Sequence, residues 1–254
     1  TITTSIDGDL AEILVYNRLL SATERVAVES YLNLKWNLNS QPAFTDDLPV
    51  TGASVHLDVT NPSSVQTASK QPAQPGENVG FWYNVAGTGA VQQATDNRRP
   101  IFGTNTINGK RTVHFDGSDD ILSATGVYSN TGNSVSAFVV MQRTANNTYA
   151  RSISFAGPDS GTDWNSNSNW CLDNGGNGTT MYVERGSGHS QGSLPATGTP
   201  YIAEVVFNGS TCTTYLDGNL LGAAFSSSGN FNINQIAVGA SAQVGEFFNG
   251  DIAE

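Results

Sequence analysis

The chain has 254 residues, enough to bury roughly 70 to 75% of its unfolded surface around one hydrophobic core without metals or disulfides. Its formal net charge of −11 argues against nucleic acid and anionic membrane surfaces as partners, because no basic surface is left for phosphate groups. Only 13% of the residues are charged and no apolar run reaches the ~20 residues of a membrane span, so we expect no membrane insertion.

The two ends of the sequence carry the same short motif. Asp7-Gly8-Asp9-Leu10-Ala11-Glu12 matches Asn249-Gly250-Asp251-Ile252-Ala253-Glu254. The spacing is far too long for a solenoid repeat, but it suits one β-sandwich domain. We therefore expect the sequence to span one period of a longer, repetitive protein.

The start of the chain predicts a strand followed by a helix. Residues 10–16 are rich in strand formers, as expected of a strand buried in a core. Ser21 and Glu24 have the spacing of a capping box and predict a helix over residues 22–35. Its apolar stripe, expected to face the protein, is Val28, Leu32 and Trp36. The opposite face, expected in solvent, carries Arg25, Glu29 and Asn33.

Residues 37–52 have the composition of a linker, with Pro42, Asp46, Asp47 and Pro49 and no periodicity, and predict a domain boundary. The domain that follows covers residues 53–254. Its predicted strands are 54–59, 112–115, 137–142, 201–207, 211–216 and 233–238. Asn208-Gly209 predicts a tight hairpin, because both residues tolerate positive φ. Short strands between turn signals, with one helix, predict a β-sandwich or jelly roll.

Four further motifs occur in a fixed order: Val55-His56-Leu57-Asp58, His114-Phe115-Asp116-Gly117-Ser118-Asp119-Asp120, Tyr215-Leu216-Asp217-Gly218 and Phe248-Asn249-Gly250-Asp251-Ile252-Ala253-Glu254. Together they resemble the laminin-G-like, concanavalin-A-like lectin and glucanase superfamily, as found in large bacterial surface proteins. The resemblance covers nearly all of the chain from residue 53, and also residues 7–36. It implies an all-β jelly-roll sandwich with one short peripheral α-helix, a fold that hosts lectins, adhesion modules, spacers and enzymes alike.

In the family, the closing strand continues into a tyrosine, an Asn-Arg turn and a short helix. Here that continuation stands at the front, as residues 12–18 and the helix that ends at Trp36. We therefore expect residues 1–36 to complete a laminin-G-like domain in a neighbour, either a covalently linked repeat or a separate subunit in a filament. The expected contact residues are Leu10, Ile13, Val15, Val28, Leu32 and Trp36. In a third arrangement these residues fold onto their own domain, but a simple permutation would not need two copies of the motif.

Two groups of residues are candidate ligand sites. Trp164, Asn165, Trp170 and Asn174 offer aromatic faces and amides for a sugar, with core packing as the alternative for the tryptophans. Asp116, Asp119 and Asp120 offer hard oxygen ligands for Ca²⁺, with a hydrogen-bonded turn as the alternative.

The even cysteine count, Cys171 and Cys212, predicts a disulfide in an extracellular chain, with two buried thiols as the alternative. No paired-carboxylate strand, zinc-binding spacing of histidines or nucleophile elbow occurs, so we expect no enzymatic activity. The predicted function is an extracellular structural or adhesive repeat of a bacterial surface protein or filament, whose partners are copies of itself. The alternative is a glycan-binding module, assisted by calcium, of a secreted polysaccharide-active enzyme.

Overall fold

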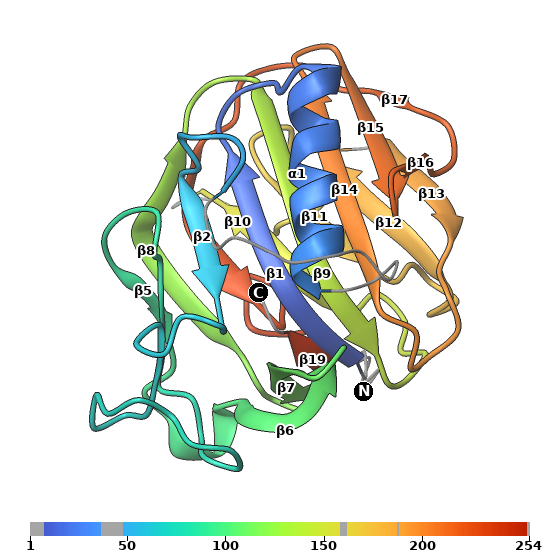
Figure 1. Ribbon diagram of the computed structural model, residues 1–254. Helices are drawn as coiled ribbons and strands as arrows, with labels where there is room; N and C mark the ends of the chain where they lie inside the picture. The colour runs from blue at the N-terminus through green and yellow to red at the C-terminus, as the bar shows by residue number, and fades with distance from the viewer. Residues whose placement is uncertain (1–7, 37–47, 158–161, 187, 253–254) are drawn as a thin grey trace.

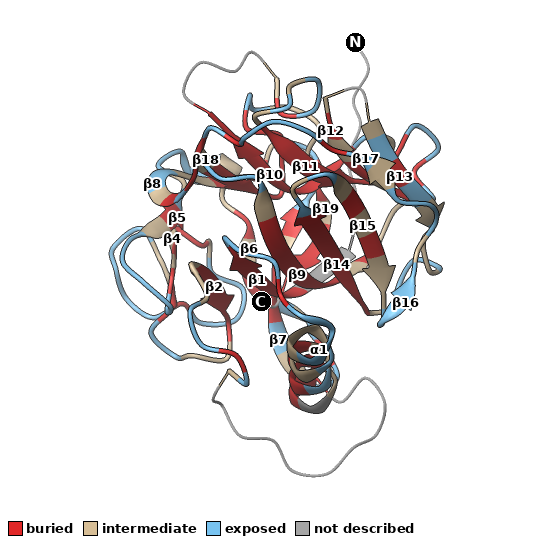
Figure 2. Cartoon of the chain, turned by 90° about the horizontal axis from the view of Figure 1, so that it is seen from above, coloured by how far each residue is buried: buried red, intermediate tan, exposed pale blue. Residues whose placement is uncertain are grey.

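The structure, a computed structural model, describes residues 8–36, 48–157, 162–186 and 188–252 (Figure 1). Two β-sheets pack face to face, and one helix lies on the outer face of the first sheet (Figures 1 and 2). This arrangement is the all-β jelly-roll sandwich with a peripheral helix that the sequence predicts.

The first sheet has ten strands in the order β16-β15-β14-β9-β1-β19-β7-β6, with β17 paired to β15 and β2 paired to β1. Its strands are β1 (Gly8–Tyr16), β2 (Val55–Asp58), β6 (Ile101–Ile107), β7 (Lys110–Asp116), β9 (Ser134–Arg143), β14 (Tyr201–Asn208), β15 (Thr211–Leu216), β16 (Asn219–Leu220), β17 (Phe225–Ser226) and β19 (Asn249–Ile252).

The second sheet has nine strands in the order β13-β12-β11-β10-β18-β8-β5-β4-β3. They are β3 (Val65–Gln66), β4 (Phe81–Tyr83), β5 (Ala90–Gln92), β8 (Leu122–Asn130), β10 (Arg151–Ala156), β11 (Trp170–Asp173), β12 (Thr180–Arg185), β13 (Gly188–Ser193) and β18 (Ile233–Val238). A single 3-10 turn, Asp96–Arg98, precedes β6.

Helix α1 (Ala22–Trp36) begins at the predicted capping box. Glu24 N donates to Ser21 Oγ at 3.3 Å, and Ser21 N donates to Glu24 Oε2 at 2.9 Å. The apolar stripe is fully buried, as predicted: Val28, Leu32 and Trp36. The prediction that Arg25 faces solvent is wrong. Its guanidinium lies 2.9 Å from a carboxylate oxygen of Glu204 on β14, because that buried charge on the outer face of the sheet needs a positive partner.

Among the described residues, no helix has the length and apolar character that crossing a membrane requires. Of the expected linker, residues 48–52 have no regular secondary structure, and residues 37–47 lie outside the described residues.

The interior between the sheets is filled by aromatic and branched apolar side chains. Phe155 of β10 stacks on Trp170 of β11 with ring centroids 4.5 Å apart, and Phe207 of β14 approaches Trp170 from the opposite sheet at 5.6 Å. Such aromatic pairs stabilise a core by roughly 0.5–1.5 kcal/mol beyond the burial of their area. Figure 2 shows the buried residues concentrated along the strands of both sheets. These contacts hold the two layers together.

The hairpin between β14 and β15 turns at Asn208-Gly209, as predicted. Gly209 has a φ of +95°, whereas Asn208 is not among the residues with positive φ. Asn208 acts instead through its side chain, whose Oδ1 accepts hydrogen bonds from the backbone N–H groups of Ser210 and Thr211. The turn is therefore made by one glycine and one side-chain acceptor.

Candidate functional site

The two copies of the terminal motif reach the same place in the first sheet. Their parallel register pairs Gly8 with Gly250, Asp9 with Asp251 and Leu10 with Ile252. This register equals the spacing of the two motifs in the sequence. In Figure 1, β19 accordingly lies beside the start of β1. The repeat in the sequence is therefore also a repeat in space.

Both copies face the same residue of β9. Met141 is paired with Leu10 of β1 and also with Ile252 of β19. On its other side, Met141 pairs with Tyr201 of β14. Along this edge of β9, Met141 has hydrogen-bonding positions for one fully paired strand, yet the structure brings both copies there, paired also with each other.

Both copies also face the same residue of β7. His114 pairs with Asp9, and its Nδ1 lies 2.7 Å from Oδ1 of Asp251. The Asp251 carboxylate is fully buried and also accepts a hydrogen bond from Asn105 Nδ2. Burial lowers the pKa of His114, and its Nδ1 is within hydrogen-bonding distance of the carboxylate. We name the position between β7 and β9 the closing slot.

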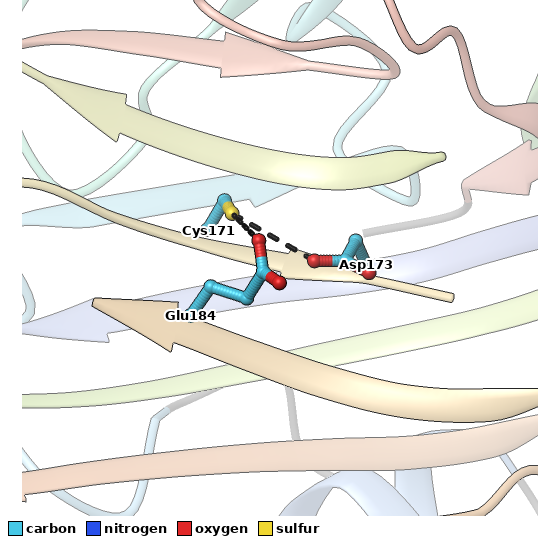
Figure 3. A group of neighbouring side chains, drawn as sticks. All are labelled: Cys171, Asp173 and Glu184. Atoms are coloured by element: carbon cyan, nitrogen blue, oxygen red, sulfur yellow. Dashed lines mark hydrogen bonds between the residues drawn. The ribbon is translucent and has the colours of Figure 1, made fainter. Parts of the chain in front are cut away.

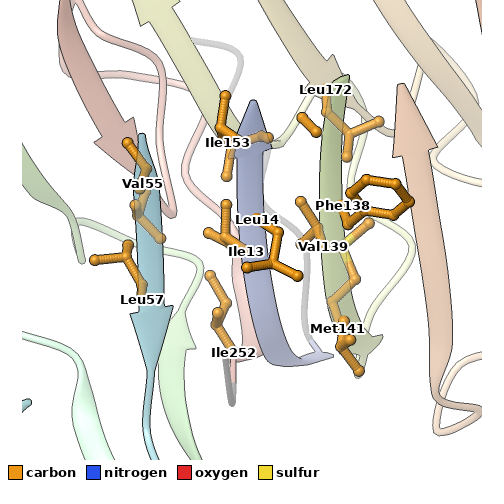
Figure 4. Packing of buried hydrophobic residues seen from close by; sticks show 14 of the residues in the cluster. Ile13, Leu14, Val55, Leu57, Phe138, Val139, Met141, Ile153, Leu172 and Ile252 are labelled. Atoms are coloured by element: carbon orange, nitrogen blue, oxygen red, sulfur yellow. The ribbon is translucent and has the colours of Figure 1, made fainter. Parts of the chain in front are cut away.

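Beyond the shared motif, only β1 continues. Its residues Ile13 and Val15 pair with Val139 and Ala137 of β9 on one side and with Leu57 and Val55 of β2 on the other. All six are buried, and Figure 4 shows the side chains of Ile13, Val55, Leu57 and Val139 beside Ile252 in one apolar cluster. Because β1 is a central strand here, it joins β2 to the rest of the sheet.

A buried group of polar side chains fastens the end of α1 to β1 and β2. Trp36 Nε1 donates to Glu12 Oε2 at 2.8 Å, and His56 Nε2 lies 3.0 Å from Glu12 Oε1. Lys35 Nζ lies 3.0 Å from Asp58 Oδ2 and 3.6 Å from Glu12 Oε2. None of the five residues is more than 9% exposed. We name Glu12, Lys35, Trp36, His56 and Asp58 the joint group. Their mutual contacts explain why a lysine and a glutamate are tolerated in the interior.

The predicted contact residues Ile13, Val15, Val28, Leu32 and Trp36 are fully buried against their own chain, and Leu10 holds the register described above. We name residues 8–36, which comprise β1 and α1, the closing segment. In the structure it completes the sheet of its own chain, the arrangement that the duplicated motif argued against. Completion of a neighbour by the same segment stays a prediction.

A hollow of about 710 Å³ opens beside the joint group. Its walls include Val50, His56, Asp58, Thr60, Pro62 and Val85. Among its described walls there is no Trp, Tyr or Phe, so it offers no flat aromatic face for a sugar ring.

The predicted sugar-binding residues do not form one surface. Trp164 is 42% exposed and Asn165 beside it is exposed, so these two remain accessible. The prediction for Trp170 is wrong, because its ring is fully buried in the core aromatic stack. Asn174 is 2% exposed and donates to the backbone oxygen of Asn147, so it is not accessible either.

The predicted calcium ligands Asp116, Asp119 and Asp120 do come together, with one carboxylate oxygen of each within 4.8 Å of the others. Backbone amides already use part of this set. Asp116 Oδ1 accepts from the N–H groups of Ser118 and Asp119, and Asp120 Oδ2 accepts from the N–H of Asp116. This turn explains the geometry without an ion, and calcium stays a prediction.

The predicted disulfide is not formed. Cys171 of β11 and Cys212 of β15 are both free and fully buried. The alternative of two buried thiols is therefore the correct one.

The joint group was not predicted from the sequence. One signal was present, since Glu12 interrupts an otherwise apolar strand and Lys35 directly precedes the last residue of the apolar stripe. A charge in such a place predicts a buried partner, but the identity of that partner depends on the fold.

The described architecture defines the class of protein as a two-sheet jelly-roll sandwich. No protein-family model and no curated protein matches the chain. Among solved structures, the mouse laminin alpha1 chain, domains LG4-5, is similar, with 11% sequence identity and a TM-score of 0.36. The similarity covers 48% of this chain and 32% of the laminin chain, so it spans about a third of that structure.

Proposed function

We propose that this chain is an extracellular structural and adhesive unit of a bacterial surface protein or filament, joined to its neighbour through the closing segment. The observation that supports the proposal is the closing slot, where Met141 and His114 face both copies of the motif. The slot has hydrogen-bonding positions for one fully paired strand, whereas the structure brings both copies into it. In a head-to-tail series, one copy fills the chain's own slot and the other copy enters the slot of the next unit.

The closing segment has enough apolar surface to hold two units together. Five of its side chains are fully buried where it docks: Ile13, Val15, Val28, Leu32 and Trp36. Burying one such side chain contributes roughly 1.5–3 kcal/mol. The joint group adds directional hydrogen bonds that fix the helix on the strands. The same contacts serve a covalent tandem repeat and a separate subunit equally well.

Disulfide trapping between chains tests the proposal. Val15 is directly opposite Ala137, so Val15→Cys in one chain and Ala137→Cys in another can bond only when the closing segment of the first docks on the second. The two variants are refolded together at high concentration, oxidised and separated on a non-reducing gel. We expect a covalent dimer.

A matched control uses Val15→Cys with Val139→Cys, since Val139 is opposite Ile13 rather than Val15. We expect little or no dimer from that mixture. If the opposed pair gives folded monomers without a bond between chains, the closing segment does not complete a neighbour and the proposal fails.

The role that we propose is nonenzymatic. Incubation of the folded chain with a panel of polysaccharides should release no oligosaccharides, and release that depends on the protein would overturn this part of the proposal.

A second candidate function is a carbohydrate-binding module, and the exposed Trp164 supports it. An exposed indole ring can stack on the apolar face of a sugar, and the amide of Asn165 can hydrogen-bond its hydroxyl groups. A glycan array probed with the wild type and with Trp164→Ala tests this function. Binding that the substitution abolishes would favour it, and a wild type that binds no glycan would rule it out.

A further inference from the structure

The outer face of the second sheet holds a buried group of charges that is separate from the closing slot. Arg151 of β10 is 1% exposed and is surrounded by four carboxylates. The distances from its nitrogens are 3.5 Å to Asp163, 3.3 Å to Asp173, 3.5 Å to Glu184 and 3.0 Å to Glu246. Charge-assisted hydrogen bonds are usually about 2.7–2.9 Å long, so one guanidinium does not satisfy these four groups.

Three atoms that could act as metal ligands converge beside this guanidinium. Cys171 Sγ lies 3.9 Å from Asp173 Oδ2 and 4.0 Å from Glu184 Oε2, and all three atoms lie within 4.8 Å of one another (Figure 3). The pleat causes this convergence. Cys171 and Asp173 are two residues apart on β11, so their side chains point to the same face of the sheet. Glu184 of β12 is directly opposite Cys171.

The spacing of the three atoms is close to that of metal ligands. With Zn–S near 2.3 Å and Zn–O near 2.1 Å, two ligands of a tetrahedral zinc ion are roughly 3.6 Å apart. The observed separations of 3.9 and 4.0 Å exceed this value by a few tenths of an ångström. Small side-chain rotations would close that difference.

A second observation concerns a buried carboxylate beside the same guanidinium. Asp163 is 1% exposed, and its Oδ1 atom has no hydrogen-bond partner. Its other oxygen accepts from Ser154 Oγ at 2.7 Å and lies 3.5 Å from Arg151 Nε, so this carboxyl belongs to the same group. A buried carboxylate oxygen without a partner is costly, and a bound cation would remove that cost.

An ion that binds this group competes with protons for the same atoms. Four carboxylates face one guanidinium, and burial raises the pKa of Asp173 to about 8. Burial also raises the pKa values of Glu184 and Glu246, and it raises that of the Cys171 thiol well above its ordinary value. Without a metal, the group therefore retains protons near neutral pH, and an ion that binds must displace them.

We propose that this group binds one divalent zinc ion through Cys171 Sγ, Asp173 Oδ2 and Glu184 Oε2, with the Asp163 carboxylate as a further negative group. The sulfur ligand selects zinc over calcium or magnesium, which prefer oxygen alone. Arg151 does not bind the ion itself but contacts the carboxylates of Asp173 and Glu184 and fixes their orientation. The ion can enter from the side of Glu184 and Glu246, whose side chains are 15% and 36% exposed.

Metal binding by the full chain tests this site. The purified protein is stripped with a chelator, equilibrated with Zn²⁺ and analysed for bound metal, and Co²⁺ then replaces Zn²⁺ as a spectroscopic probe. We expect about one ion per chain and a sulfur-to-cobalt charge-transfer band. Cys171→Ala should remove that band and weaken binding at least tenfold.

Cys212→Ala is the matched control, since it removes the other fully buried thiol, from β15 of the first sheet. It should keep both the stoichiometry and the band. Glu184→Gln provides a second ligand variant that preserves side-chain volume, in case Cys171→Ala does not fold. A folded wild type that retains no zinc, or zinc binding that neither ligand variant weakens, would overturn the proposal. If the protein binds Ca²⁺ as tightly as Zn²⁺, Cys171 Sγ is not a ligand of the ion.

Discussion

At the scale of single residues, Glu12 is the side chain on which most of the joint group depends. It accepts a hydrogen bond from Trp36 and contacts His56 and Lys35, all in the interior. Replacement of Glu12 by Leu would remove the buried carboxylate that these partners share. We expect Glu12→Leu to lower the free energy of unfolding by roughly 3–5 kcal/mol, measured by urea denaturation.

Glu24 gives the comparison for that prediction. Its ion pair with Arg18 lies in solvent, so Glu24→Gln should shift the urea midpoint far less than Glu12→Leu does. Equal shifts in the two variants would mean that the buried contacts around Glu12 do not stabilise the fold.

Asp120 predicts a pH dependence of stability. Burial raises its pKa in the folded chain to about 7, above the value of about 3.9 in an unfolded chain. Between these pH values the folded chain binds more protons than the unfolded chain, so the contribution of Asp120 to the free energy of unfolding falls as the pH rises. Asp120→Asn removes this contribution, and from pH 4 to pH 8 the free energy of unfolding of the variant should rise by on the order of 4 kcal/mol relative to that of the wild type.

Paired urea titrations of the two proteins at several pH values measure that difference, and a constant difference would contradict it. The same titrations at pH 8 with added Ca²⁺ test the predicted calcium site. If an ion binds Asp116, Asp119 and Asp120, calcium should stabilise the wild type and should stabilise Asp120→Asn much less.

At the scale of elements, the helix stabilises the fold through one face. Leu32 is fully buried, whereas Val26 on the same helix is 59% exposed. We expect Leu32→Ala to cost roughly 2–5 kcal/mol of stability and Val26→Ala less than about 0.5 kcal/mol. Thermal unfolding of the two variants checks this difference. Similar losses would mean that α1 does not dock through its apolar stripe.

The closing slot predicts that the carboxy-terminal copy is partly redundant. A chain that ends at Phe248 lacks β19, but Asp9 and Leu10 of β1 have the same partners on β7 and β9. This truncated chain should fold and lose less stability than Ile13→Ala, which removes a buried side chain that no second copy can replace. A truncated chain that is unfolded would show that the two copies are not equivalent.

The sequence predicted the strands with clear apolar patterns and failed where polar residues are buried. Residues 211–216 and 233–238 were predicted with the boundaries of β15 and β18. The strand β10 was missed although residues 152–155 alternate between polar and apolar, and all six of its residues are buried, including Arg151. The strand β11 has four residues within an Asn-, Ser- and Gly-rich stretch, too short for a pattern, so the sequence predicts no strand around Trp170.

At the scale of the whole molecule, the fold class follows from turn spacing and composition, but the neighbours of each strand do not. β1 lies between β9 and β2, strands that are far apart in the sequence, and a local pattern carries no information about such pairing. The same holds for the Arg151 group, whose residues come from three strands and two connecting segments.

The placement of the closing segment also predicts how the chain associates. If the segment exchanges between chains, the assembled form depends on concentration, because docking becomes a reaction between molecules. Refolding at low concentration should give monomers, and refolding at high concentration should give larger species by size-exclusion chromatography with light scattering. Identical profiles at both concentrations would argue for a closed monomer.

Helix α1 covers the outer face of the first sheet, and loops cover the opposite side of the sandwich. If neighbouring units are joined through the closing segment, as proposed, insertions and substitutions in those loops lie a full sandwich thickness away from the joining contacts. We expect natural variants of this protein to differ most along that far side, so that a row of linked units could change its antigenic appearance without weakening its attachment.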